Sequence, residues 1–109
     1  MKAVSVTIIK KELQHRSSDE LMALCLRLSR FKKENKELLT YLLFESDDEN
    51  AYVRGIKREM DESFDAVNRR TFYVMKKDIR KILRTIKKYI RYSKKKSTEV
   101  ELLIYFCQK

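Results

Sequence analysis

Hydrophobic residues recur every three or four positions along most of the chain, which is the period of one face of an α-helix. The pattern is clearest between Phe72 and Tyr92, where lysines and arginines fill the positions between the apolar ones. This amphipathic pattern predicts a helix with one side in a core and the other in solvent. The apolar positions of this segment are Phe72, Met75, Ile79, Ile82, Leu83, Ile86, Tyr89 and Ile90.

A second helix is predicted to begin at Ser17, because Ser17 and Glu20 have the spacing of a capping box. In that motif the serine oxygen and the glutamate each accept a hydrogen bond from the other residue's amide. The helix then carries one apolar face, formed by Leu21, Leu24, Cys25, Leu28 and Phe31.

Two readings remain open for residues 18–45. The polar segment Lys32–Glu37 separates the face that ends at Phe31 from a further face. One long helix could run through it, or the chain could break near Phe31–Lys33 and return as an antiparallel hairpin. We favour the hairpin, because a domain of this size is compact. The further face consists of Leu38, Leu39, Leu42 and Leu43.

Residues 3–14 are ambiguous, because Val4, Val6 and Ile8 alternate as in a strand while Val4, Ile8 and Leu13 suit a short helix. We favour the helix, because the chain offers no other clear strand with which residues 4–8 could pair.

The acidic segment Glu45–Asn50 predicts a loop that ends in the cap of the next helix. That helix is expected to bury Tyr52, Val53, Ile56, Met60, Phe64 and Val67, and its Gly55 indicates a close helix contact. Residues 68–71 are predicted to turn into the basic helix.

The last helix is predicted to begin with a capping box at Thr98–Glu101. It should bury Val100, Leu103, Ile104 and Cys107. The fold class is therefore all-α, with about five helices packed as successive antiparallel hairpins.

Composition supports one soluble helical domain over residues 1–109. The chain has no proline and one glycine, which argues against an all-β fold and against a flexible linker. No apolar run approaches the length of about 18 residues that a membrane span needs, and the N-terminus has no convincing signal peptide. We expect a cytoplasmic protein that does not bind membranes.

Charge is concentrated in one part of the chain. Between Arg69 and Lys96 there are 13 lysines and arginines and one acid, Asp78, so this segment has a charge of +12, whereas the whole chain has a net charge of +10. The remainder sums to −2. A basic stripe on one helix is either a solvated face or a surface that attracts phosphates.

The sequence offers no catalytic constellation. The two cysteines, Cys25 and Cys107, lie in apolar helical patterns and are expected to be buried free thiols. They do not form a zinc site with the single histidine, His15, which is expected in a solvated turn. We therefore expect no enzyme, no metal, no cofactor and no small-molecule substrate.

The chain resembles an uncharacterised bacterial all-helical family of unknown function in three segments, KKELQHRSSDELM, IRKILRTIKKYIRY and TEVELLIYF. Its members are similar to short helical-repeat proteins. The resemblance implies successive helical hairpins and supports a break near Phe31. It implies no catalytic or binding residues.

Two functions remain as hypotheses. The first is a small interaction module that presents a helix face to a protein partner or to a second copy. The alternative is a nucleic-acid-binding protein that contacts mostly the phosphate backbone, with Tyr73 and Tyr92 near the stripe for base stacking. The residues that would make these contacts are Lys77, Arg80, Lys81, Arg84, Lys87, Lys88 and Arg91.

Overall fold

The computed structural model describes residues 1–109 and contains only helices, turns and loops. The all-α prediction is confirmed, although the chain forms six α-helices and a short π-helical turn rather than five helices. The helices divide between two compact units, Met1–Leu39 and Thr40–Lys109. The single domain over residues 1–109 stays a prediction, and the two units are described separately.

The N-terminal unit begins with α1, Val6–Leu13, so the helical interpretation of this segment is right and the strand is wrong. Its N-cap is Ser5, whose side chain accepts a hydrogen bond from the Ile8 amide. In α2, Ser18–Phe31, both hydrogen bonds of the predicted capping box between Ser17 and Glu20 are present.

The predicted break near Phe31–Lys33 is confirmed. Lys32 has extended backbone angles (φ −139°, ψ 147°), and α3, Lys33–Thr40, starts directly after it. The Asn35 side chain holds this corner by donating to the Leu28 carbonyl at 2.8 Å. However, α2 and α3 share few contacts, so the break does not by itself create a packed hairpin.

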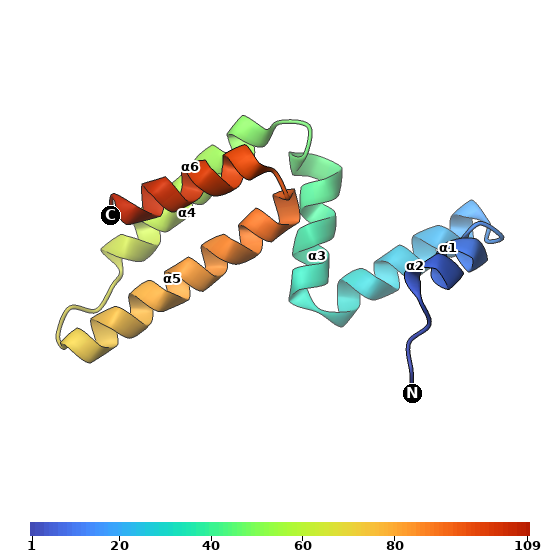
Figure 1. Cartoon of the computed structure of the whole chain (residues 1–109), viewed down its shortest axis with the longest axis horizontal. Helices are drawn as coiled ribbons and strands as arrows, with labels where there is room; N and C mark the ends of the chain where they lie inside the picture. The colour runs from blue at the N-terminus through green and yellow to red at the C-terminus, as the bar shows by residue number, and fades with distance from the viewer. The chain divides into compact units, whose positions relative to one another are not determined.

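The C-terminal unit is a bundle of three helices, each of which contacts the other two (Figure 1). They are α4, Glu49–Asp65, α5, Phe72–Ser93, and α6, Lys96–Cys107. Short connections make neighbouring helices antiparallel, as the hairpin prediction requires. The core consists of Val53, Ile56, Met60, Val67, Ile82, Ile86, Ile90 and Leu102.

The π-helical turn η1, Tyr41–Glu45, precedes the bundle and contacts α4 and α5. The wider π turn shifts the side-chain register, so Tyr41 is buried while Leu42 and Leu43 are exposed. The predicted face through Leu42 and Leu43 is therefore wrong. The predicted acidic cap is confirmed at Asp48, which accepts a hydrogen bond from the Ala51 amide.

Gly55 does not mark a close helix contact. A Cβ atom at this position would meet only the flexible end of Arg58, at 4.0 Å. Of the six apolar positions predicted for α4, Val53, Ile56 and Met60 are buried. Tyr52 and Phe64 are partly buried, and Val67 is buried but lies beyond the end of α4.

The start and the face of α6 differ from the prediction. The helix begins at Lys96, and Thr98 is a buried residue of its first turn rather than a cap. Leu102 is fully buried, whereas Val100 and Ile104 are half exposed. The segment VELLIYFC is apolar on every side, so its periodicity could not select the buried face.

Both cysteines are exposed, which corrects the prediction that they are buried. Cys107 is the last residue of α6, and Cys25 lies in a helix that has no buried residue. His15 is exposed in the turn between α1 and α2, as predicted.

Candidate functional site

The seven basic residues predicted as a site do share one side of α5. Their spacings of three and four residues place them within about a third of the helix circumference, over about 21 Å of its length. We call this surface the basic stripe. Six of its members are exposed, namely Lys77, Arg80, Lys81, Arg84, Lys87 and Arg91. The seventh, Lys88, is half-buried, with its ammonium 5.6 Å from the centre of the Tyr89 ring.

None of these six exposed residues forms an ion pair within the chain. The ion pairs of the bundle lie elsewhere, for example between Lys57 and Glu101 at 3.1 Å and between Lys109 and Asp61 at 2.7 Å. Of the acids in the second half of α4, Asp61 pairs with Lys109, and none of them pairs with the six exposed residues of the basic stripe.

The two tyrosines near the stripe differ in their accessibility. Tyr73 is 77% exposed at the start of α5 and lies on the same side as the stripe. Tyr92 is half-buried, and its ring centre lies 6.2 Å from that of Tyr89. Tyr73 is therefore the better stacking platform of the two.

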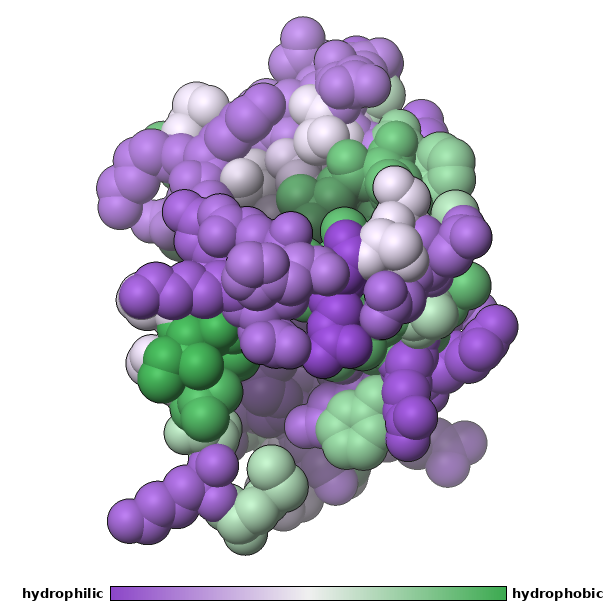
Figure 2. Space-filling model, turned by 90° about the vertical axis from the view of Figure 1, so that its right-hand side faces the viewer, coloured by the Kyte–Doolittle hydropathy of each residue, from purple (hydrophilic) through white to green (hydrophobic).

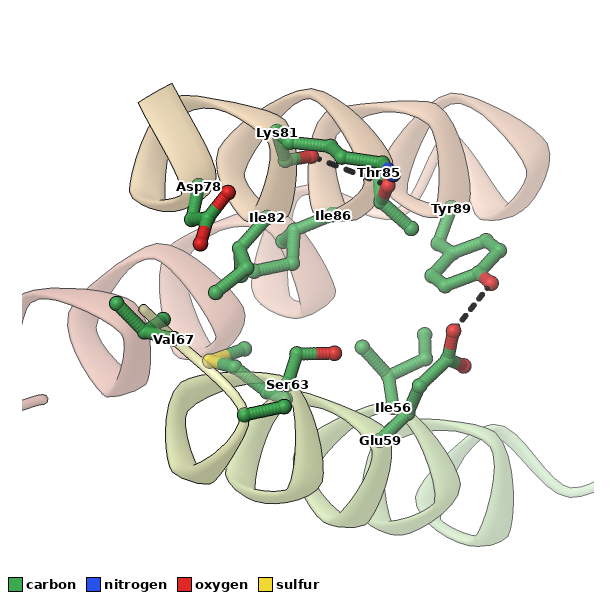
Figure 3. A pocket seen from close by; sticks show the side chains of 12 residues that line it. Ile56, Glu59, Ser63, Val67, Asp78, Lys81, Ile82, Thr85, Ile86 and Tyr89 are labelled. Carbon is green, nitrogen blue, oxygen red and sulfur yellow. Dashed lines mark hydrogen bonds between the residues drawn. The ribbon is translucent and has the colours of Figure 1, made fainter. Parts of the chain in front are cut away.

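A cavity of about 300 Å³ lies between α4 and α5 (Figure 3). Its floor is apolar and includes Ile56 and Ile86. At its rim, the Tyr89 hydroxyl donates to Glu59 at 2.8 Å, and Asp78 accepts from the Asn68 amide at 3.0 Å. These carboxylates already have partners within the chain, so the cavity presents no obvious catalytic pair.

The polar centre of the bundle is Glu49, which sequence reasoning missed. Its carboxylate accepts hydrogen bonds from hydroxyls on three other elements, those of Tyr41, Ser93 and Thr98. Burial disfavours its charge, but these hydrogen bonds and the ammonium of Lys95 outweigh that cost, so the pKa of Glu49 lies below its ordinary value.

The N-terminal unit contrasts with the bundle in its burial. Helices α1, α2 and α3 contain no buried residue. Large apolar side chains are instead exposed, including Met22 at 63%, Leu28 at 62% and Phe31 at 77%. Apolar residues also reach the surface in patches among hydrophilic ones in Figure 2.

Contacts between α1 and α2 are partly polar. Arg16 pairs with Glu12 at 2.9 Å and with Glu20 at 3.3 Å, which ties the two helices together across their turn. Both pairs are solvent-exposed and contribute little to stability. A groove between the helices is lined by Ile8, Leu13 and Leu24 among others.

No group of three or more His, Cys, Asp or Glu side chains is arranged to hold a metal ion. No helix is both long enough and apolar enough to cross a membrane. Comparison of the chain with protein-family models, with curated proteins and with solved structures finds no significant match. The bacterial origin and repeat character implied by the resemblance therefore stay predictions.

Proposed function

We propose that the protein is a non-enzymatic helical interaction module whose N-terminal unit binds a protein through its apolar surface. The observation that carries this proposal is that three well-formed helices contain no buried residue yet expose many large apolar side chains. Short helices obtain most of their stability from packing an apolar face. A protein partner would supply that packing.

The test compares the wild type with Leu28→Glu by light scattering across a wide range of concentrations, alone and with candidate partner proteins. Leu28 is largely exposed, so the charge should leave the monomer folded while it abolishes association. Arg27→Glu, a charge change on the adjacent residue, is the matched control. Association that persists unchanged in Leu28→Glu, with the helix content retained, would reject the proposal.

A second candidate function rests on the basic stripe, which could bind the phosphate backbone of a nucleic acid. Its support is the set of six exposed cations without ion pairs on one side of α5. Lysines and arginines that neutralise phosphates release counterions, so binding weakens as salt is added.

Anisotropy titrations with labelled single-stranded and double-stranded oligonucleotides test this candidate. Replacing Lys77, Arg84 and Arg91 by Glu should weaken binding and make the dependence of log K on log salt shallower by about 2–3. The control replaces Lys10, Lys11 and Lys33, which gives the same charge change outside α5 and should preserve the slope. An unchanged slope in the α5 variant would reject this candidate.

A further inference from the structure

One side of α2 faces away from α1 and carries no charge. Helix α1 approaches α2 on the side of Glu20, Ala23 and Arg27, which line the groove between them. Helical spacing places a second set of residues on the opposite side of α2. We call this set the outer face of α2, and it consists of Ser18, Leu21, Met22, Cys25, Leu26, Leu28 and Ser29.

The outer face has the pattern of a helix-pairing seam. Ser18, Met22, Cys25 and Ser29 follow one another at intervals of four, three and four residues, as the core positions of a two-helix coiled coil do. All the residues of this face are exposed except Ser29, which is half-buried. The small side chains at Ser18 and Ser29 would allow a second helix to approach closely.

Charges at the edge of this face specify which helix fits it. Asp19 and Arg30 are eleven residues apart, about three helical turns, so they border the same edge of the face at opposite ends. Both are exposed, and neither forms an ion pair within the chain. A helix that reverses this arrangement would set an arginine beside Asp19 and an aspartate beside Arg30.

The helix that provides this reversal is α2 itself, turned by a two-fold rotation. In such an isologous contact each surface meets its own copy, so a face with one acid and one base at its two ends is self-complementary only when antiparallel. In a parallel two-fold pair the two equivalent edges lie on opposite sides of the interface, so Asp19 would lie beside neither charge of the partner. The charge-free seam also lets two copies of a chain with net charge +10 meet without burying a cation.

We infer that two copies of this chain pair antiparallel through the outer face of α2, with Asp19 of each copy beside Arg30 of the other. Cys25 then lies near the two-fold axis. The inference rests on the proposed function, for which it names a second copy as the partner.

A charge swap tests this arrangement in the full-length chain. Sedimentation equilibrium should show that Asp19→Arg and Arg30→Asp each raise the dimer Kd by about tenfold, because each brings like charges together. The double variant restores opposite charges and should return the Kd to near its wild-type value. Arg27→Asp is the matched control, since it changes the charge on the side that faces α1, and it should leave the Kd unchanged.

Cross-linking gives a readout that does not depend on the stability of the variants. In a Cys107→Ser background, mild oxidation should link two chains through Cys25, and Cys25→Ser should abolish the product. A dimer that is indifferent to all the charge changes and is not linked through Cys25 would overturn the inference but leave the proposed function standing. A chain that stays monomeric at every concentration would overturn the inference outright.

Discussion

Glu49 connects four elements of the C-terminal unit through a single side chain, so its charge should matter for stability. Glu49→Gln keeps the shape but removes the carboxylate that three hydroxyls share. At neutral pH we expect it to lower the free energy of unfolding by about 1–3 kcal/mol, as for a lost hydrogen-bond acceptor in a partly buried site. Urea titrations followed by circular dichroism measure this change.

The same residue predicts a pH dependence. Because the folded pKa of Glu49 is lowered, its contribution is complete above the ordinary glutamate pKa of about 4.3 and is lost as the pH falls through the lower folded value. The difference between wild type and Glu49→Gln should therefore shrink in acid. Glu99→Gln is the control, since its ion pair with Lys96 is exposed and its effect should stay within about 0.5 kcal/mol. Equal stability of Glu49→Gln and wild type at neutral pH would contradict the prediction.

Gly55 is a position where the chain can gain stability. It lies inside α4, and the space around it accepts a Cβ atom without a clash. Gly55→Ala should raise the free energy of unfolding by about 1 kcal/mol, which is the difference in helix propensity between the two residues. Ala51→Gly, in the first turn of the same helix, should lower it. A destabilised Gly55→Ala in the same urea titration would show that this position needs glycine for another reason.

At the scale of one helix, the end of α5 depends on a residue in an unfavourable conformation. Lys94 adopts the left-handed conformation (φ 60°, ψ 7°), and its amide donates to the Ile90 carbonyl at 2.9 Å. Glycine adopts this conformation without steric cost, so Lys94→Gly should raise the free energy of unfolding by about 1 kcal/mol.

Replacing a lysine by glycine in the middle of α5 should have the opposite effect on the free energy of unfolding. Lys87 is exposed and helical, so Lys87→Gly should lower the free energy of unfolding by about 1 kcal/mol. Both variants lose one lysine, so their difference in thermal melting reports backbone conformation alone. Equal effects of the two replacements would mean that the turn after α5 has no influence on stability.

The sequence predicts best the helices in which apolar residues recur every three or four positions, with polar residues on the opposite side. In α4 and α5 the periodicity identifies the buried side, with Ile82, Ile86 and Ile90 in the core. Phe72 is an exception, because it opens α5 and is 74% exposed. In α6 the apolar residues surround the helix, and the buried side is set by tertiary contacts such as that between Thr98 and Glu49.

The candidate functional residues likewise include some that the sequence predicts and some that it does not. The basic stripe follows from helical spacing alone, so sequence predicts its members. The Glu49 hydrogen bonds join residues up to 49 positions apart, and no local pattern could bring them together. The exposure of Cys25 depends on which elements pack over α2, which periodicity does not reveal.

At the scale of the whole chain, the two units should differ when separated. The fragment 40–109 contains every residue of the core and should unfold cooperatively on its own, with a melting temperature close to that of the full chain. The fragment 1–39 has no core of its own. Helices of 8 to 14 residues are marginal in water without packing. Its helix content should therefore rise with concentration as chains associate.

Far-UV circular dichroism over a range of concentrations measures this contrast, because association adds helical signal only to the fragment that lacks a core. Leu28→Glu in the fragment 1–39 should remove the concentration dependence, whereas the spectrum of the fragment 40–109 should be the same at every dilution. If the fragment 1–39 were monomeric and fully helical when dilute, its helices would need no partner, and the apolar side chains of α2 would be exposed without a binding role. If the fragment 40–109 failed to fold, the bundle would depend on the first 39 residues for its stability.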